Sequence, residues 1–244
     1  MLERQQLVRL LRQVPLLHGL GPNDLSGVAA AAQCREIERR RFFFRQGTIA
    51  DAVYVLNRGR VKLTQSTPKQ AHVLLRFIAP GEMFDLTSLD GQPYTLSAEA
   101  TRWSQAVVWK VPTMIALMER YPSIAVNALR EMAARLQELR ERYRELATER
   151  VERRVAHALI RLAREAGWRR ESGFSLVDIP LSRQDLAEMT GTTLYTVSRI
   201  LAGWRRDGII ESGRQRLAIL QPSAVQAIAE DLPGATSGDE KPKT

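Results

Sequence analysis

Residues 181–201, with the sequence LSRQDLAEMTGTTLYTVSRIL, constrain the fold more than any other stretch, because one glycine separates two short helical patterns. Ser182 and Asp185 have the spacing of a capping box, which predicts a helix from about 183 to 190. Gly191 then ends this helix, since a residue without a Cβ adopts positive φ at little cost. A second helix is expected to follow.

The second helix, expected from about 193 to 204, has one apolar and one polar face. Apolar and polar residues alternate at steps of three and four, so each kind gathers on its own side. Two short helices joined by a glycine turn have the form of a helix-turn-helix, whose second helix enters the major groove of DNA. The apolar residues are Val197, Ile200, Leu201 and Trp204, and the polar ones are Thr192, Tyr195, Thr196, Ser198 and Arg199.

Arg199 is the first candidate for reading a base, because a guanidinium donates two hydrogen bonds to guanine O6 and N7. Ser182 and Arg183 lie at the start of the first helix, where we expect them to hold a phosphate. The sequence GIIESGRQRLAIL predicts a hairpin wing that turns Arg214 and Arg216 toward the DNA backbone. Further candidates are Thr192, Leu194, Tyr195 and Ser198 for the bases, and Thr193 and Thr196 for the phosphates.

The alternative to DNA binding is an ordinary helical hairpin with a solvated polar face. The formal net charge of +9 suits a polyanionic partner, but the basic residues are spread along the chain and do not locate a site. The wing that follows the helix pair favours DNA binding. We expect no enzyme, because the sequence has no nucleotide-binding glycine loop, metal-ligand cluster or nucleophile elbow.

Residues 35–111 change to short β-branched and aromatic runs separated by glycine and proline. This spacing predicts an antiparallel sandwich or barrel. Asn57-Arg58-Gly59, between VYVL and RVKL, predicts a tight hairpin. Residues 1–17 predict an amphipathic helix, and no stretch has the roughly 18 apolar residues of a membrane span, so no membrane partner is expected.

The pattern from Thr113 to about Ala147 is helical, and apolar residues recur at alternating steps of four and three from Ala125 onward. This narrow stripe predicts a coiled-coil seam of about three heptads and hence a homodimer. The alternative is a single helix that lies on its own sheet, which usually needs a broader apolar face. The predicted seam residues are Leu129, Met132, Leu136, Leu139, Tyr143 and Leu146.

The helix-turn-helix stretch resembles the DNA-reading motif of the CRP/FNR superfamily of bacterial transcription regulators, and the resemblance covers nearly the whole chain. It implies a homodimer that binds a palindromic operator in double-stranded DNA, contacts RNA polymerase and responds to a signal sensed by a β-roll. By this similarity Arg199 falls on the base-reading arginine and Ser198 on the serine of the FNR branch, whereas Tyr195 replaces the usual glutamate. The alternative is a cyclic-nucleotide-binding regulatory module that controls a partner protein.

The expected fold is α+β, with an N-terminal antiparallel β-roll of the cyclic-nucleotide-binding jelly-roll type, a long dimerisation helix and a C-terminal winged helix-turn-helix. Cys34, the only cysteine, excludes an intramolecular disulfide and an iron-sulfur cluster held by four cysteines, and it indicates a cytoplasmic protein. The predicted boundaries are 1–112 for the N-terminal helices and sensor, 113–149 for the dimerisation helix, 150–231 for the DNA-binding domain and 232–244 for a disordered tail.

Two residue pairs decide what the sensor is expected to bind. In cAMP-binding members a glycine-glutamate pair holds the ribose and an arginine-serine pair holds the phosphate, and the matching positions here are Asp85-Leu86 and Tyr94-Thr95. Without the arginine no charge offsets a buried phosphate, and Asp85 repels it, so no cAMP is expected. These four residues and Met83 form the predicted effector pocket.

The TGTTLYTVSRIL motif is most similar to the nitrogen-oxide-responsive branch of the superfamily, some of whose members are thought to use haem. Neutral imidazole is a usual iron ligand, and the candidates are the three histidines, His18, His72 and His157. Each histidine also has an ordinary interpretation. His18 would be a residue at the end of a loop, His72 a surface residue of a strand, and His157 a helix residue near the hinge. The sequence leaves three possibilities open for the sensor: it responds to haem-bound nitric oxide, it responds to another small ligand, or the protein binds DNA without any ligand.

Overall fold

The structure is a computed structural model in which the chain forms two compact units, Met1–Arg140 and Glu141–Thr244. The boundary between these units falls inside the helix that the sequence predicts for dimerisation. The predicted disordered tail lies outside the described residues except for its first residue, Leu232. The structure describes residues 4–66, 72–84, 89, 91–166, 169–171, 174–177, 181–212 and 217–232.

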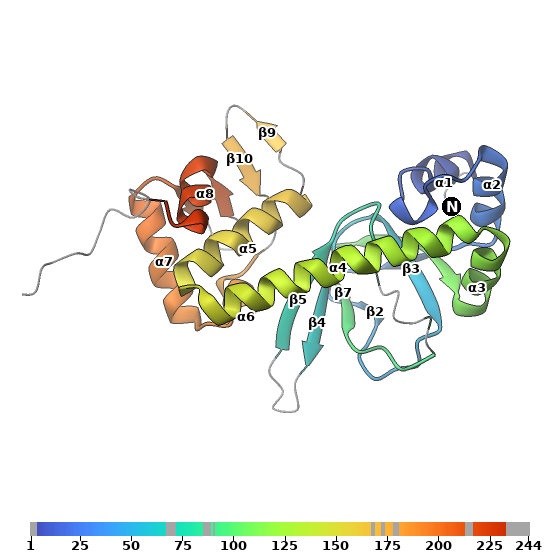
Figure 1. Ribbon diagram of the computed structural model, residues 1–244, viewed down its shortest axis with the longest axis horizontal. Helices are drawn as coiled ribbons and strands as arrows, with labels where there is room; N and C mark the ends of the chain where they lie inside the picture. Colours follow the sequence, from blue (N-terminus) through green and yellow to red (C-terminus); the bar gives the residue numbers. More distant parts are fainter. Residues whose placement is uncertain are drawn as a thin grey trace, which may run out of the picture. The chain divides into compact units, whose positions relative to one another are not determined.

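The first unit contains a β-roll of two antiparallel sheets, as the sequence predicts (Figure 1). One sheet has the strand order β1-β8-β3-β6 and the other has the order β2-β7-β4-β5. The bounds are β1 Gln33–Ile37, β2 Phe42–Phe44, β3 Ala52–Arg58, β4 Val61–Ser66, β5 His72–Ile78, β6 Met83–Phe84, β7 Ser97–Ala100 and β8 Ser104–Lys110.

The hairpin predicted at Asn57-Arg58-Gly59 is wrong. Strand β3 pairs with β8 and β6, whereas β4 pairs with β5 and β7, so the chain passes from one sheet to the other at this glycine. Gly59 has φ +101°, and a Cβ there would collide with the backbone and side chain of Ser104. The Arg60 backbone N–H donates to Ser104 Oγ at 3.1 Å, which holds the crossing in place.

Two apolar cores stabilise this unit. The core between the sheets is aromatic: Phe44 stacks on Tyr94 with ring centroids 4.0 Å apart, and Phe43 meets Tyr54 and Phe84 edge to face. The second core lies between the β1-β8-β3-β6 sheet and the helices around it, with Trp109 buried and its Nε1 donating to the Val28 carbonyl at 3.0 Å. The helices that flank this sheet at the N-terminus are α1 Arg4–Leu11, the 3-10 helix Pro15–Leu17 and α2 Pro22–Ala30.

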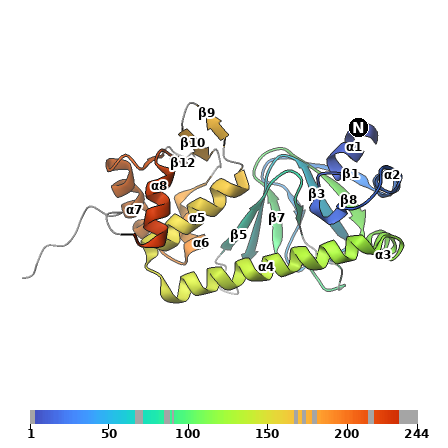
Figure 2. The same ribbon diagram turned by 45° about the horizontal axis from the view of Figure 1, so that its top comes forward.

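The predicted dimerisation segment forms two helices, α3 Val111–Arg120 and α4 Pro122–Thr148. Pro122 causes the break, because proline cannot continue a helix hydrogen-bond ladder but fits its first turn. The start of α4 is anchored to the N-terminal segment by Asn127, whose Nδ2 donates to the carbonyls of Leu16 and His18 at 3.1 and 2.8 Å. Figure 2 shows α4 as a long rod that passes close to β5.

The second unit is the predicted winged helix-turn-helix. Its antiparallel sheet has the order β11-β12-β10-β9, and α5 packs against α6 and α8. Among the described residues no helix is long and apolar enough to span a membrane. The elements are α5 Val151–Ala166, β9 Arg169–Glu171, β10 Phe174–Val177, α6 Arg183–Thr190, α7 Leu194–Arg206, β11 Ile210–Ser212, β12 Leu217–Ile219 and α8 Pro222–Glu230.

Candidate DNA interface and effector cavity

Helix α6 begins and ends at the residues that the sequence predicts. Ser182 Oγ accepts from the Asp185 backbone N–H at 3.0 Å, and Asp185 Oδ2 accepts from the Ser182 N–H at 2.9 Å, which completes the capping box. Gly191 ends the helix in the left-handed region at φ 60° and ψ 44°. A Cβ on Gly191 would lie 3.1 Å from Leu146 Cδ2, so the end of α4 packs against the turn between the two helices.

Helix α7 has the two faces that the sequence predicts. Val197, Leu201 and Trp204 are buried, whereas Arg199 and Tyr195 are exposed, Tyr195 to 78%. Arg199 makes no ion pair with any described residue, so its guanidinium is available to a ligand. The other base-reading candidates are Leu194, which is 47% exposed, and Thr192 and Ser198, which are partly exposed.

The phosphate candidates differ in how much hydrogen-bonding capacity they retain. Arg183 is exposed at the start of α6 and has no ion pair among the described residues. Ser182 is engaged in the capping box. Thr193 Oγ1 caps α7 by accepting from the Thr196 N–H at 3.1 Å, and the two hydroxyls lie 2.9 Å apart. Strands β11 and β12 pair as the wing requires, but Arg214 and Arg216 lie outside the described residues.

Helix α5 carries both helices of the motif. Trp204 Nε1 on α7 donates to Glu152 Oε1 at 2.8 Å. Arg154 Nε donates to the Thr190 carbonyl at the end of α6 at 3.0 Å. Since each bond joins α5 to one helix, α5 fixes the orientation of the pair.

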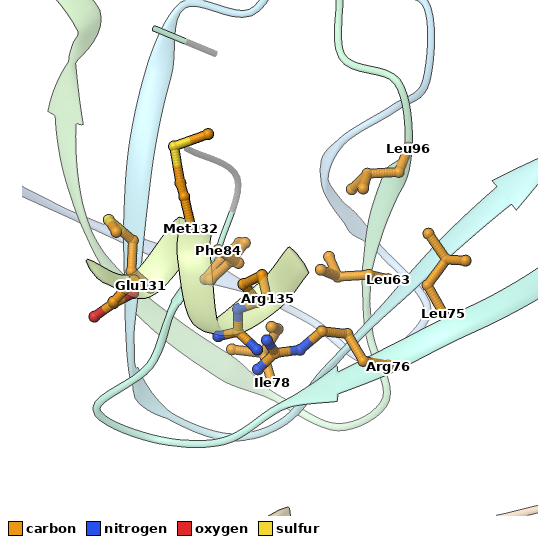
Figure 3. A pocket seen from close by; sticks show the side chains of 10 residues that line it. Leu63, Leu75, Arg76, Ile78, Phe84, Leu96, Glu131, Met132 and Arg135 are labelled. Atoms are coloured by element: carbon orange, nitrogen blue, oxygen red, sulfur yellow. The ribbon is translucent and has the colours of Figure 1, made fainter. Parts of the chain in front are cut away.

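A cavity of about 270 Å³ lies between the β-roll and α4 (Figure 3). Its lining is mainly apolar, with charged groups contributed by Arg76, Glu131 and Arg135. Arg76 Nη2 is paired with Glu82 Oε2 at 2.7 Å, and Arg135 is within 3.6 Å of Glu138. The lining residues are Leu63, Leu75, Arg76, Ile78, Met83, Phe84, Leu96, Glu131, Met132 and Arg135.

Met83 is the predicted pocket residue that lines this cavity. Tyr94 instead lies in the core between the sheets, where its hydroxyl donates to the Ala52 carbonyl at 3.0 Å. Burial raises the pKa of Tyr94 above its usual value, with the neighbouring Tyr54 adding to the shift. Thr95 is exposed, and the pair Asp85-Leu86 lies outside the described residues.

Sequence reasoning missed the charged residues of the cavity. Arg76 interrupts the apolar strand HVLLRFI, which is a signal that could have found it, because an arginine inside such a run is expected to have a buried partner. Glu131 and Arg135 are four residues apart on α4 and have no such signal. Burial raises the pKa of Glu131, and the nearby Glu82 carboxylate adds to this effect.

The three histidine candidates lie on different elements of the chain. His18 is exposed at the end of the 3-10 helix, and the side chain of His72 is outside the described residues. His157 on α5 has Nε2 at 3.2 Å from Glu149 Oε2. Among the described residues no group of three or more histidine, cysteine or acidic side chains could hold a metal ion, and no histidine lines the cavity. Cys34 is exposed on β1, and partial burial raises its thiol pKa.

The predicted seam forms an exposed apolar stripe on α4. Its six side chains are between 48% and 74% exposed in the single chain, and Val126 extends the stripe toward the start of the helix. Met132 belongs both to this stripe and to the cavity lining. The stripe consists of Leu129, Met132, Leu136, Leu139, Tyr143 and Leu146.

Two family models match the chain, and each falls on one part of the fold. The cyclic nucleotide-binding domain matches residues 34–121, and the Crp-like helix-turn-helix domain matches residues 153–228. The chain is therefore a DNA-binding transcription regulator that joins a β-roll of the cyclic nucleotide-binding domain type to a helix-turn-helix. More specifically, it is a regulator of the CRP/FNR family.

Characterised relatives have the same organisation over most of their length. The Cyclic AMP receptor protein of Thermus thermophilus is 27% identical over 219 residues, which are 89% of this chain and 98% of the relative. The nitrogen fixation regulation protein FixK of Azorhizobium caulinodans is 29% identical over 194 residues, 80% of this chain and 77% of the relative. The structure of FixK2 from Bradyrhizobium japonicum matches this structure with a TM-score of 0.71 at 22% sequence identity. The match covers 81% of this chain and 96% of FixK2, and it supports the fold.

Proposed function

We propose that this regulator acts as a homodimer that reads an inverted-repeat operator through Arg199 of each α7, under the control of a small ligand in the β-roll cavity. The exposed guanidinium of Arg199 carries the DNA-reading part of this proposal. A guanidinium at the centre of a polar helix face pairs with guanine O6 and N7 in the major groove. Contact with RNA polymerase belongs to the same proposal, because the resemblance to the CRP/FNR superfamily implies it.

The apolar stripe on α4 supports the homodimer. Leu129, Leu139 and Tyr143 are each more than 60% exposed, which is unfavourable for a single chain in water. A facing copy of α4 would bury them by knobs-into-holes packing at the heptad spacing. A two-fold dimer presents its recognition helices about one DNA turn, roughly 34 Å, apart, which explains why the operator should be an inverted repeat.

Tyr195, Ser198, Thr192 and Leu194 surround Arg199 and are proposed to contact adjacent bases. Arg183 is the stronger phosphate candidate at the start of α6, because Ser182 already uses its hydroxyl in the capping box. Thr193, Thr196 and Arg214 are proposed to complete the contacts to the backbone.

The cavity favours a small and mostly apolar ligand. The relative from Thermus is named for cyclic AMP, so cAMP is the first alternative. Against it stands Tyr94, which occupies the place of the phosphate-binding arginine in the family resemblance and is stacked on Phe44 in the core. Arg76, the buried cation nearest the cavity, is already neutralised by Glu82.

Haem-bound nitric oxide is the second alternative, because the recognition motif resembles the nitrogen-oxide-responsive branch. A haem needs an axial ligand, and the described residues that line the cavity contribute no histidine and no cysteine. We therefore place the apolar ligand ahead of haem, and an anaerobic haem titration with nitric oxide addition distinguishes them. Saturable uptake of one haem per subunit, coupled to a change in operator affinity, would favour haem.

The DNA-reading role is tested by selecting operators from random duplexes with the purified protein. We expect an inverted repeat, and Arg199→Ala should cost about 1–3 kcal/mol and relax the preference at one base pair in each half-site. Arg164→Ala is the matched control, because it removes an exposed arginine from α5 in the same unit. An equal loss of affinity on all sequences would refute base reading by Arg199.

The ligand-binding role is tested by Leu96→Trp, which fills the cavity with a larger side chain. Calorimetry and operator binding are measured with cAMP, with haem and with a panel of apolar metabolites. A compound that binds the wild type but not the variant, and that changes operator affinity only in the wild type, identifies the ligand class. No binding by any compound, together with equal operator affinity of both proteins, would contradict control through this cavity.

A further inference from the structure

Two carboxylates are buried where α4 meets α5: Glu145 lies in the last turn of α4, and Glu149 directly follows this helix. The side chain of Glu145 is 5% exposed and that of Glu149 is 2% exposed. Burial of a carboxylate is costly unless opposite charges and hydrogen bonds compensate it. Arg161 of α5 compensates Glu145 with Nη1 at 2.6 and 2.8 Å from its two oxygens.

Glu149 is compensated less completely. Arg144 and Arg153 have nitrogens at 3.1 and 3.7 Å from its Oε1, but neither oxygen of Glu149 accepts a well-oriented hydrogen bond. His157 Nε2 on α5 lies 3.2 Å from Glu149 Oε2 and is itself buried without a hydrogen bond. Because the two orphaned atoms adjoin, a rotation of the imidazole ring that turns an N–H on Nε2 toward this carboxylate would satisfy both.

These four residues form a clamp, which we define as Glu145 of α4, Glu149 directly after α4, and His157 and Arg161 of α5. Arg154 extends the clamp to the DNA-reading helices, since its Nη1 donates to the Glu149 carbonyl at 3.1 Å and its Nε to the Thr190 carbonyl. The clamp thus connects the last turns of α4 with the end of α6 through α5.

The same turns of α4 carry Tyr143 and Leu146, two residues of the proposed dimer seam. In a dimer, the position of each recognition helix relative to the two-fold axis then depends on how firmly α5 is held to α4. We propose that the clamp sets the spacing between half-sites that this regulator accepts, with His157 as its positioning residue. This inference rests on the proposed homodimer.

The test compares wild type, His157→Leu and His157→Gln on four DNAs. These are the selected operator, the operator with one base pair added at its centre, the operator with one base pair removed there, and a duplex with one half-site. Glutamine keeps an N–H donor near the position of Nε2, whereas leucine keeps the bulk and removes the donor. We expect wild type and His157→Gln to lose about tenfold or more in affinity when the spacing changes, because the second half-site can no longer be engaged.

For His157→Leu we expect unchanged half-site affinity and a spacing preference reduced to about threefold or less. A wild-type spacing preference in His157→Leu would overturn the clamp while leaving the homodimer intact. A wild type that ignores spacing would overturn the proposed dimer and the clamp together. The affinity of each variant for the duplex with one half-site shows whether the variant has simply lost DNA binding.

A second variant covers the case in which His157→Leu does not fold. Arg161→Lys keeps the charge on α5 but withdraws it on a shorter side chain from the place of Nη1, the one nitrogen that contacts both oxygens of Glu145. Spin labels at Gln184, introduced as cysteine in a Cys34→Ser background, then report the distance between the two motifs of the dimer. We expect a broader distance distribution in Arg161→Lys than in its parent, and identical distributions would overturn the proposal.

Discussion

Gly191→Ala should destabilise the helix-turn-helix by about 1–2 kcal/mol, because φ 60° and ψ 44° place this residue in the left-handed region that a Cβ disfavours. The new Cβ would also lie 3.1 Å from Leu146 Cδ2. That contact adds little, since it involves the far end of a flexible side chain that is 49% exposed. The backbone conformation therefore dominates the cost.

Gly203→Ala is the matched control and should have the opposite sign. Gly203 lies inside α7, and a Cβ added there meets no atom within 4 Å. Alanine in a helix interior is favoured over glycine by about 0.5–1 kcal/mol. Hydrogen exchange of peptides from α6 and α7 in the full-length protein measures both changes as free energies of opening. Equal protection in the two variants, or a stabilised Gly191→Ala, would refute the reasoning.

Other consequences can be tested on the same full-length protein. Leu139→Glu should convert the dimer to monomer in sedimentation experiments and weaken operator binding, because it places two carboxylates in the seam; a variant that stays dimeric would contradict the seam. Tyr94→Phe should lower the free energy of unfolding by about 1 kcal/mol, because the hydroxyl bonds to the Ala52 backbone are lost, and an unchanged urea midpoint would count against this. Because the folded-state pKa of Glu131 is raised above its ordinary value of 4.5, its stabilising contribution is full below that pH and is lost as the pH rises through the folded pKa. Glu131→Gln should therefore increase stability at pH 7 relative to wild type and reduce the difference between pH 4 and pH 7; a less stable variant at pH 7 would show that the carboxylate is favourably paired.

The DNA-reading motif was predictable because its signals are local. A capping box, a glycine and a periodic apolar face each act within a few residues, and α6 runs over the predicted residues 183–190.

The same reasoning failed for the hairpin predicted at Gly59. A glycine indicates positive φ but not which strands pair beyond it, and here the close approach of Ser104, far away in sequence, requires the glycine. Strand pairing depends on residues far apart in the sequence, so the turn residues alone could not predict it.

The effector cavity shows the same limit more strongly. Tyr94 was assigned to it because it matches the phosphate-binding arginine of cAMP-binding family members, yet its aromatic ring is stabilised by stacking on Phe44 in the core. Arg76, Glu131 and Arg135 line the cavity because a strand and a helix that are distant in sequence come together there. A cavity of this kind is defined by packing, so sequence spacing alone identified only Met83 among its described lining residues.

The apolar stripe on α4 includes two residues that have a second role. Met132 lines the cavity, and Leu146 packs at Gly191 in the turn between α6 and α7. In the proposed dimer both side chains would also face the partner helix, so their rotamers would depend on how the seam packs. A ligand that displaces Met132 therefore perturbs the first half of the seam, and a change in seam packing at its last residue reaches Gly191 through Leu146. In the proposed dimer, coupling between the cavity and the DNA-reading helices can thus pass along a single face of one helix.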